Sequence, residues 1–237
     1  MINGSFGNEN RSPIRSSSRF ASGLVMLASV WIGLFWTAGR WSWFQGWAFL
    51  SFFAVYVGAL SIWLARTNPD LYAERTRIAD NIEPWDKWVV KLYSLSLLAT
   101  VFVGALDSGR FGWSTVPPVI QLGGWVGLCL AATMIWHVMA VNNFLSAWVR
   151  IQPDRNQFVV TKGAYGWVRH PMYLAVVIAA FCVPLVLASW WALIPGLCVA
   201  VLIMYRTARE DRTLIDKLPG YKEYTEAVRY RLLPGIW

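Results

Sequence analysis

Six stretches of this chain are apolar and almost free of charge. They run over residues 20–39, 43–65, 88–106, 119–149, 172–188 and 190–205. A helix of roughly 20 apolar residues spans the hydrocarbon core of a bilayer and satisfies its own backbone hydrogen bonds there. Only 14% of the 237 residues are charged, whereas soluble domains have about 25%. The sequence therefore predicts an all-α integral membrane protein with about six transmembrane helices, the last two forming a short hairpin.

Lysine and arginine residues gather on one predicted side of the bilayer. Of the 21 in the chain, only Arg40 and Arg110 fall on the other side. Because cytoplasmic loops are enriched in Lys and Arg, we expect both termini in the cytoplasm, in a bacterial inner membrane or the endoplasmic reticulum. Basic residues beside lipid headgroups also account for the net charge of +8, so we expect contact with membrane lipids and no nucleic-acid partner.

The polar stretches divide the chain into three parts. We expect a flexible cytoplasmic N-terminal tail over 1–19, membrane helices over 20–118 with a cytoplasmic loop at 66–87, and a C-terminal core of helices and tail over 119–237. Asn68 and Pro69 in that loop predict the start of a short surface helix, because proline is well tolerated in the first turn after a polar cap. The loop at 107–118, on the other side, is expected to hold little chemistry.

The cysteines do not indicate a metal site or a disulfide. Cys129, Cys182 and Cys198 lie within predicted spans and form no CxxC pair, so we interpret them as packing residues. The sequence also has no HExxH motif, no His/Cys cluster and no GxGxxG motif. It therefore predicts neither a metal centre nor a Rossmann nucleotide-binding domain.

Three polar residues lie toward the inner end of the fourth predicted span. His137, Asn142 and Asn143 stand in an otherwise apolar stretch, with His137 the deepest. Polar side chains within a span usually face the interior of the helix bundle. They can bond neighbouring helices or form the wall of a cofactor or substrate cavity, and the sequence leaves both readings open.

The segment TKGAYGWVRHPMYLA, residues 161–175, concentrates polar and aromatic side chains at the start of the fifth span. Glycines allow tight turns and close approach of a ligand, Arg169 suits a carboxylate or phosphate, and Pro171 fits the first turn of a helix. His170 and Tyr173, three residues apart, would share a helix face. Binding of an anion or cofactor and anchoring in the lipid headgroups both explain this pattern.

A second polar cluster follows the sixth span. Arg206 and Arg209 precede the adjacent acids Glu210 and Asp211. Adjacent residues on a helix point to different sides, so one acid can face a cavity while the other pairs with a cation. Because the last two spans form a hairpin, we expect this cluster on the same side of the membrane as Arg169. A ligand site beneath the hairpin is the interpretation we favour over structural ion pairing.

These segments together resemble a known family. VVTKGAYGWVRHPMYLA, then ARED, then LPGYKEYTEAVRYRLLPGIW is similar to the isoprenylcysteine carboxyl methyltransferase family of integral membrane methyltransferases, in a wider group with the phospholipid N-methyltransferases. The resemblance is strongest over 143–237, and NPDLYAERTR is similar to the family's cytoplasmic loop. The chain departs from the family pattern at three places. It has Ala164 where the family usually has Pro in Gly-Pro-Tyr, and Ala175 where the family often has Gly. It has Glu210-Asp211 where the family has Glu-Glu, which leaves the role of Asp211 open.

The resemblance implies S-adenosylmethionine as the cofactor and S-adenosylhomocysteine as its product. The implied cofactor-binding residues are Gly163, Tyr165, Arg169, His170, Pro171, Tyr173 and Glu210. We expect Glu210 to bind the ribose hydroxyls or the ammonium group, and Arg169 or His170 to bind the carboxylate. Tyr165 and Tyr173 would pack against the adenosine or the methionine chain.

The predicted acceptor is a lipophilic small molecule or a lipidated molecule that arrives from the bilayer. Arg206, Arg229 or Arg231 would orient a carboxylate acceptor, whereas an amine acceptor would need Glu210 or Asp211 as a base. The predicted catalytic residues are Glu210, Arg206 and Arg169, and the predicted substrate-binding residues are Asn142, Asn143, Arg229 and Arg231.

Other functions stay open at this point. A phosphatidylethanolamine N-methyltransferase or a small-molecule methyltransferase would use the same cofactor, whereas a sterol-type NADPH reductase would not. A transporter or assembly factor would be no enzyme at all. The sequence does not predict the oligomeric state, because the pair of Gly123 and Gly127 is only thin support for a dimer.

Overall fold

The computed structural model describes residues 28–77 and 81–237, and within these ranges the chain forms helices and connecting segments without strands. The predicted tail over 1–19 and the start of the first predicted span lie outside the described residues. The longer helices are Ala28–Ala38, α2 (Phe44–Thr67), α4 (Pro84–Gly104), α5 (Pro118–Val141), α6 (Pro171–Val186) and α7 (Leu193–Lys217). The shorter elements are α3 (Pro69–Thr76), the π-helix η1 (Ala105–Phe111), the 3₁₀ turns η2 (Pro153–Arg155) and η3 (Gly163–Gly166), and α8 (Tyr221–Ala227).

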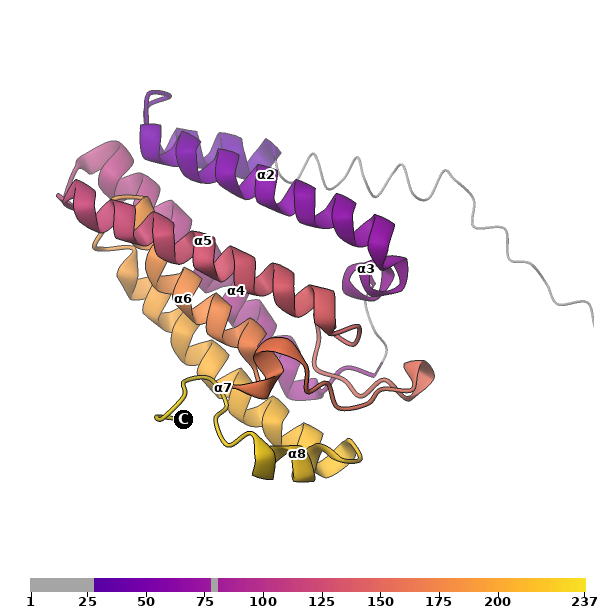
Figure 1. The fold of residues 1–237 in the computed structure, drawn as a ribbon. Coiled ribbons are helices and arrows are strands. Elements are labelled where there is room, and N and C mark those ends of the chain that lie inside the picture. The colour runs from indigo at the N-terminus through magenta and orange to yellow at the C-terminus, as the bar shows by residue number, and fades with distance from the viewer. Residues whose placement is uncertain (1–27, 78–80) are drawn as a thin grey trace, which may run out of the picture.

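A bundle of long helices forms the body of the protein (Figure 1). α5 packs on α6, α6 on α7, and α7 on α4, while α2 lies along α5. The short helices α3 and α8 lie at one end of the bundle, together with the segment that joins α5 to α6 (Figure 1). Because polar residues are concentrated in these pieces, this is the end at which a polar site can form.

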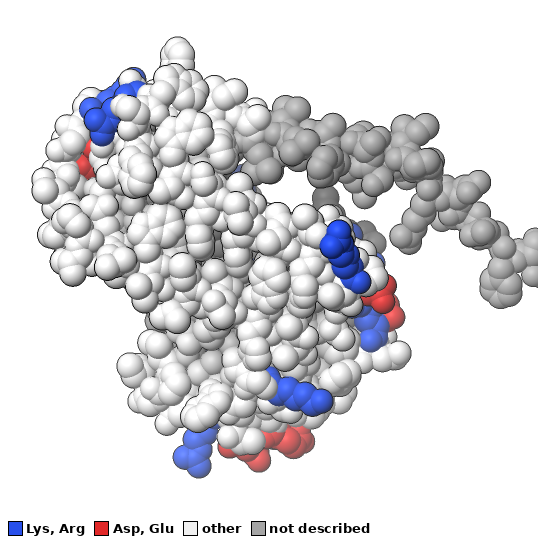
Figure 2. Space-filling model, turned by 45° about the horizontal axis from the view of Figure 1, so that its top comes forward, with Lys and Arg blue, Asp and Glu red and all other residues white. Residues whose placement is uncertain are grey.

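Three of the helices are long and apolar enough to cross a bilayer. They are Phe44–Thr67, Pro84–Phe111 and Pro118–Val141, and the shorter apolar helices Ala28–Ala38 and Pro171–Val186 accompany them. Large apolar side chains face outward from these spans, with Val55 72% and Leu122 63% exposed. Figure 2 shows charged side chains at the two ends of one face and an uncharged band between them. The chain is therefore a multi-pass membrane protein, while the number of six spans and their orientation stay predictions.

The fourth predicted span is shorter than expected. The helix ends at Val141, not at residue 149, and Asn142 caps it with extended backbone angles. The side-chain oxygen of Asn142 accepts a hydrogen bond from the backbone N–H of Phe144 at 2.8 Å. Asparagine often closes a turn in this way, so Asn142 and Asn143 stand just beyond the helix and not within a span.

The prediction for the loop at 107–118 was wrong at its beginning. The third helix continues as a π-helix to Phe111, so that Asp107 lies in a helix and is fully buried. Its carboxylate accepts hydrogen bonds from the backbone N–H of Ser114 at 2.7 Å and the hydroxyl of Ser189 at 2.6 Å. Asp107 therefore fixes the turn of the α6–α7 hairpin from the neighbouring helix.

Glycine and cysteine residues mediate close helix contacts inside the chain. A side chain at Gly127 would meet the Cys182 sulfur of α6 at 2.4 Å, whereas a side chain at Gly123 would meet nothing within 4 Å. Gly127 is thus part of the internal α5–α6 contact and not of a dimer surface shared with Gly123. Cys182 is partly buried against the core, as expected of a packing residue, whereas Cys129 and Cys198 are exposed.

Candidate active site

A cavity of about 310 Å³ opens at the end of the bundle that carries α3 and α8. Its wall comes from α3, α4, the segment between α5 and α6, and the facing ends of α6, α7 and α8. The residues of the predicted site that line it are Asn142, Tyr165, Arg169, His170, Tyr173, Arg206 and Glu210. Two clusters about 40 residues apart in the sequence thus meet at one cavity, as the hairpin argument predicted.

The turn over Gly163–Gly166 carries Tyr165 into the cavity wall. Gly163 has a φ of 63°, and a side chain there would lie 2.5 Å from the Nε2 atom of His137, so glycine is required on both counts. The Tyr165 hydroxyl accepts a hydrogen bond from the Asn142 amide at 2.7 Å, and the hydroxyl of Tyr224 donates to the Tyr165 carbonyl at 2.7 Å. Burial raises the pKa of Tyr165 above its ordinary value, so the phenol stays neutral.

The start of α6 positions His170 and Tyr173. Pro171 is the first residue of the helix, and His170 precedes it as the N-cap. The rings of His170 and Tyr173 stack with centroids 5.7 Å apart and an interplanar angle of 8°. The predicted common face is confirmed, and a flat pair of rings results at the edge of the cavity.

Arg169 holds the C-terminal tail. Its guanidinium makes two hydrogen bonds to Asp211, at 2.9 and 3.0 Å, and two more to the carbonyls of Val228 and Arg229. The backbone N–H groups of Arg169 and His170 also donate to carbonyls of the tail, each at 2.9 Å. The donors of Arg169 are thus largely committed to protein acceptors.

Asp211 is a buried acid surrounded by donors. Arg169, Arg231 at 2.8 Å and the Tyr221 hydroxyl at 3.0 Å donate to it, and the His170 ring lies 3.3 Å away. Burial by itself would raise the pKa of the Asp211 carboxyl, but hydrogen bonds from His170, Arg169 and Arg231 lower it well below the usual range. Asp211 is therefore a permanent anion that joins α6, α7, α8 and the tail.

Glu210 differs from its neighbour Asp211. It lines the cavity and accepts a hydrogen bond from the hydroxyl of Tyr173. No Lys or Arg forms an ion pair with it within 28–77 and 81–237, the described ranges. One acid thus faces a cavity and the other pairs with cations, as the adjacent positions predicted.

Arg206 pairs with an acid that the sequence analysis missed. It donates to both oxygens of Asp86 in α4, at 2.7 and 2.9 Å, and to the carbonyl of Ala147 at 3.0 Å. The Oδ2 atom of Asp86 also accepts the backbone N–H of Val149 at 2.8 Å. The available signal for Asp86 was its place just before an apolar span, two residues ahead of Trp88. Arg206 is a structural link between α4, α7 and the cavity segment.

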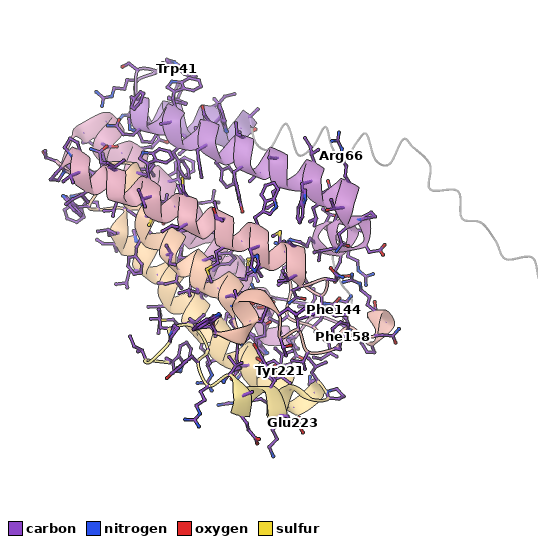
Figure 3. All side chains as sticks on the ribbon, viewed as in Figure 1. Trp41, Arg66, Phe144, Phe158, Tyr221 and Glu223 are labelled. Carbon is purple, nitrogen blue, oxygen red and sulfur yellow. The ribbon has the colours of Figure 1, made fainter. Side chains whose placement is uncertain are left out.

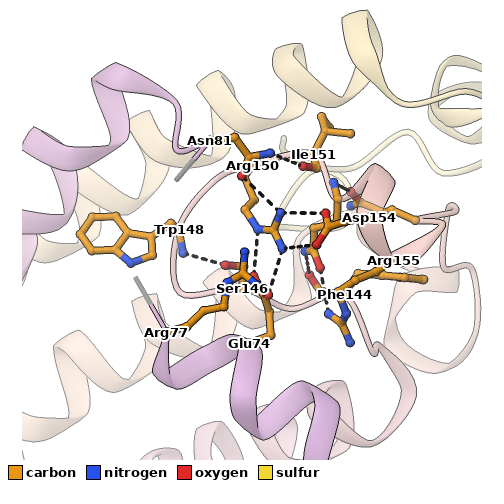
Figure 4. Close-up of polar contacts among 12 residues, drawn as sticks. Glu74, Arg77, Asn81, Phe144, Ser146, Trp148, Arg150, Ile151, Asp154 and Arg155 are labelled. Carbon is orange, nitrogen blue, oxygen red and sulfur yellow. Dashed lines mark hydrogen bonds and ion pairs between the residues drawn. The ribbon is translucent and has the colours of Figure 1, made fainter. Parts of the chain in front are cut away.

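A third cluster fastens α3 to the segment after α5 (Figure 4). Arg150 donates to both oxygens of Glu74, each at 2.9 Å, and further to Asp154 at 3.1 Å and Asn81 at 3.2 Å. Hydrogen bonds from Arg150 and from Ser146 lower the pKa of Glu74 although burial opposes this. The short helix predicted to start at Asn68–Pro69 is confirmed as α3, and this cluster holds it at the cavity wall, to which Arg75 contributes.

The structure separates the predicted substrate-binding residues. Asn142 lines the cavity, whereas Asn143 is exposed and accepts a hydrogen bond from Asn68 at 2.7 Å. Arg229 is exposed, and Arg231 pairs with Asp211 and lies over the Trp237 ring. Asn143, Arg229 and Arg231 are not lining residues of the cavity.

The cavity also has lining residues that the sequence analysis did not single out. Tyr221 and Tyr224 of α8 pack with Leu218 in a buried cluster, and all three residues line the cavity. Figure 3 shows Tyr221 on the side of α8 that faces the other helices and Glu223 on the opposite side. The motif containing Leu218 and both tyrosines had been noted, but an amphipathic seven-residue helix gives too short a pattern to show which face is buried.

Comparison with known proteins bears on this cavity directly. Residues 125–216 match the model of the isoprenylcysteine carboxyl methyltransferase (ICMT) family. Over this region, about two-fifths of its length, the chain is similar to the ICMT family. The match begins within α5 and ends within α7, and so contains η3, the start of α6 and the Glu210–Asp211 pair. No curated protein matches the chain.

The match to the ICMT family model and the apolar helices together support a membrane methyltransferase of the ICMT type. The region that matches the ICMT family model contains most of the predicted site. Arg75 of α3 and Tyr93 of α4 stand before it, and Tyr221 of α8 after it, yet all three line the same cavity.

Proposed function

We propose that this protein transfers a methyl group from S-adenosylmethionine to a lipophilic acceptor that reaches the cavity from the bilayer. The observation that carries the proposal is the Glu210 carboxylate, which lies in the wall of a cavity and forms no ion pair with a Lys or Arg of the described residues. An unpaired anion in such a place is costly, and a cationic ligand removes the cost. The alternatives that use no cationic cofactor give Glu210 no comparable role.

The residues of the cavity fit such a cofactor. Its volume of about 310 Å³ is at the lower end of the range of small-molecule sites, about 300–1,000 Å³. Tyrosine rings suit an adenine or a methionine chain, because aromatic faces attract flat rings and cations. The tyrosines in the wall are Tyr93, Tyr165, Tyr173, Tyr221 and Tyr224.

Each part of the wall then has a task. Glu210 would hold the ammonium group or the ribose hydroxyls, and the Tyr173 hydroxyl fixes the orientation of that carboxylate. Tyr165 and His170 would pack against the bound molecule. Arg169 contributes indirectly, because it holds the α8 and tail segments that close the cavity. These roles remain proposals for each residue.

The chemistry requires positioning and exclusion of water. When bound, S-adenosylmethionine supplies a methyl group on a positively charged sulfur, and an in-line displacement transfers it. The protein's part is to hold the acceptor atom in line and to keep water out, and orientation of this kind is worth several kcal/mol or more, roughly 7–11 at best. A carboxylate acceptor needs no base. An amine acceptor would release a proton, which Glu210 could accept.

Apolar side chains support a lipophilic acceptor. Val176 of α6 and Ile203 of α7 line the cavity next to Tyr93 of α4. All three lie in helices that we assign to the membrane, so the cavity reaches from its polar end toward the depth of the bilayer. An acceptor with a hydrocarbon chain could place this chain in lipid and its polar end at the cavity.

Calorimetric titration of the purified protein with S-adenosylmethionine, in mild detergent or lipid nanodiscs, tests the proposal. We expect binding by the wild type and an affinity loss of about ten-fold or more in Glu210→Ala and His170→Ala, as removal of charged or stacking contacts predicts. Glu223→Ala on the exposed side of α8 is the matched control and should bind normally. A wild type that binds no S-adenosylmethionine in either medium would refute the cofactor assignment.

The acceptor is tested separately. Labelled methyl transfer should be compared between a prenylated cysteine analogue, phosphatidylethanolamine and a total lipid extract. Transfer to the prenylated carboxylate supports the ICMT-type reaction, whereas transfer only to phosphatidylethanolamine would favour the N-methyltransferase alternative.

A further inference from the structure

The cavity wall contains four arginines, and one of them forms no ion pair with a carboxylate of the described residues. Its fully charged side chains are Arg75, Arg150, Arg169, Arg206 and Glu210. Three of these arginines are neutralised by buried carboxylates, namely Arg150 by Glu74, Arg169 by Asp211 and Arg206 by Asp86. Arg75 is the exception, because no carboxylate of the described residues forms an ion pair with it.

Arg75 lies in the last turn of α3 and is half-buried. The groups that act on it electrostatically come from four other helices, and they are Tyr56 of α2, Tyr93 of α4, Tyr173 of α6 and Arg206 of α7. Burial lowers the pKa of the Arg75 guanidinium, but arginine stays protonated in proteins. A half-buried cation beside a second arginine is unfavourable unless an anion joins it.

The fold holds Arg75 in this place. Glu74, its neighbour in α3, is buried and fixed by two hydrogen bonds to Arg150. The N-terminus of α3 is fixed as well, because the Asn68 side chain accepts the backbone N–H of Leu71 at 3.1 Å. Since adjacent helix residues point to different sides, these contacts direct Arg75 toward the cavity.

We propose that Arg75 binds the carboxylate of the methyl acceptor. The guanidinium presents paired N–H groups that match a carboxylate in two hydrogen bonds. The proposal rests on the proposed function, and it replaces the earlier assignment of carboxylate binding to Arg206, Arg229 or Arg231. Arg206 is already paired with Asp86, and the other two are not in the cavity wall.

The location of Arg75 favours the acceptor over the cofactor. α3 packs against α2, and the neighbours Tyr56 and Tyr93 belong to membrane-spanning helices. Tyr221 and Tyr224 of α8, in contrast, line the cavity from a buried cluster with Leu218 and Val228, near the tail. Arg75 also acts on Tyr173, whose hydroxyl bonds Glu210, so an acid at Arg75 would stand next to the proposed cofactor.

The test compares the binding of two analogues of the methyl acceptor. They carry the same prenyl chain and differ only in the terminal group, which is a carboxylate in one and an amide in the other. An N-acetylated S-prenylcysteine and its primary amide are titrated in phosphatidylcholine nanodiscs, with and without S-adenosylhomocysteine, with tryptophan fluorescence as the readout. We expect the wild type to bind the acid about ten- to hundred-fold more tightly than the amide, the range of a charge-assisted hydrogen bond. Arg75→Gln should abolish the preference, Arg75→Lys should keep part of it, and both should bind S-adenosylhomocysteine as the wild type does.

Arg66→Gln is the matched control. It removes an exposed charge from the end of α2 that adjoins α3 (Figure 3) and should leave the preference unchanged. Equal binding of acid and amide by the wild type would overturn the proposal, and so would weaker S-adenosylhomocysteine binding in Arg75→Gln, which would place Arg75 on the cofactor. Competition by added phosphatidic acid would assign Arg75 to a lipid headgroup instead.

The outcomes also separate this proposal from the proposed function. A wild type that binds no S-adenosylhomocysteine but keeps an Arg75-dependent preference for the acid would contradict the cofactor assignment and support the anion site. A wild type that binds S-adenosylhomocysteine without any preference for the acid would support the cofactor assignment and contradict the anion site at Arg75.

Discussion

Glu210 and Asp211 are neighbours in α7, yet their carboxylates have opposite surroundings. Asp211 is fully buried and accepts hydrogen bonds from Arg169, Arg231 and Tyr221. Glu210 lines the cavity and accepts a hydrogen bond from the Tyr173 hydroxyl. The first acid joins helices and tail into a cavity wall, and the second leaves a negative charge available to a ligand.

Tyr173→Phe should weaken cofactor binding without unfolding the protein. It removes the hydroxyl that bonds Glu210 but keeps the ring that stacks on His170. A hydrogen bond to a charged group contributes about 1.5–3 kcal/mol, so we expect a loss of about ten- to hundred-fold in affinity for S-adenosylhomocysteine by calorimetry. Tyr205→Phe, at an exposed position of α7, should bind as the wild type does. Equal affinities of Tyr173→Phe and wild type would show that this hydrogen bond is irrelevant to binding.

Asp211→Asn should lower stability strongly. The change leaves the buried Arg169 guanidinium without its counter-charge and weakens the contact with Arg231. Removal of one partner of a buried ion pair costs about 3–5 kcal/mol, which should appear as a lower unfolding temperature in mild detergent. Asp216→Asn, exposed on the same helix, should unfold at the wild-type temperature. An unchanged unfolding temperature in Asp211→Asn would refute the role of Asp211 as the link between the helices and the tail.

The stability of the protein should fall in acid in a way that depends on Asp211. Its pKa in the folded protein is lowered by hydrogen bonds from His170, Arg169 and Arg231, despite burial. A group with a depressed folded pKa stabilises the fold above its unfolded pKa, about 3.9 for Asp, and loses this contribution as the pH falls toward the folded value. We therefore expect the unfolding temperature to drop below about pH 4, and to drop less in Asp211→Asn. Parallel curves for the two proteins would contradict this.

The buried pair of Asp86 and Arg206 can be tested by replacing one or both partners. Asp86→Asn and Arg206→Gln each leave a buried charge and should cost about 3–5 kcal/mol, whereas Asp86→Leu with Arg206→Met removes both charges and should be more stable than either single variant. The comparison is made by thermal unfolding. Removal of the exposed pair of Glu83 and Lys217 should change stability by less than about 1 kcal/mol. A double variant less stable than both single variants would contradict this, because it would show that the cost of each single replacement does not come from the buried charge left without its partner.

The sequence predicted the helical membrane fold well because lipid imposes it. Long apolar runs have few alternatives to a helix in a bilayer, and Pro69 and Pro171 mark helix starts that the structure confirms. The sequence analysis misplaced two helix ends, where hydrogen bonds of polar side chains decide the backbone more than the apolar pattern does. Asn142 ends α5 early by bonding the backbone, and Asp107 continues its helix because Ser114 and Ser189 satisfy its carboxylate.

The sequence was sufficient to predict which polar residues gather at the candidate site, but not which ion pairs they form there. Adjacency on a helix predicted that Glu210 and Asp211 face different sides, but not which of them is buried. The partner of Arg206 could not be found from sequence, because Asp86 lies 120 residues away. Arg75 stands in a charged stretch whose members look alike, and only the three-dimensional contacts show that Glu74 is paired and Arg75 is not.

The central claim is that the cavity between Glu210 and Tyr165 holds the methyl donor. A structure of the protein determined with S-adenosylhomocysteine tests this most directly. We predict density for the ligand in this cavity, with the Glu210 carboxylate at hydrogen-bond distance from its ammonium group or ribose. Density for the ligand elsewhere on the protein, with the Glu210 wall untouched, would contradict the account.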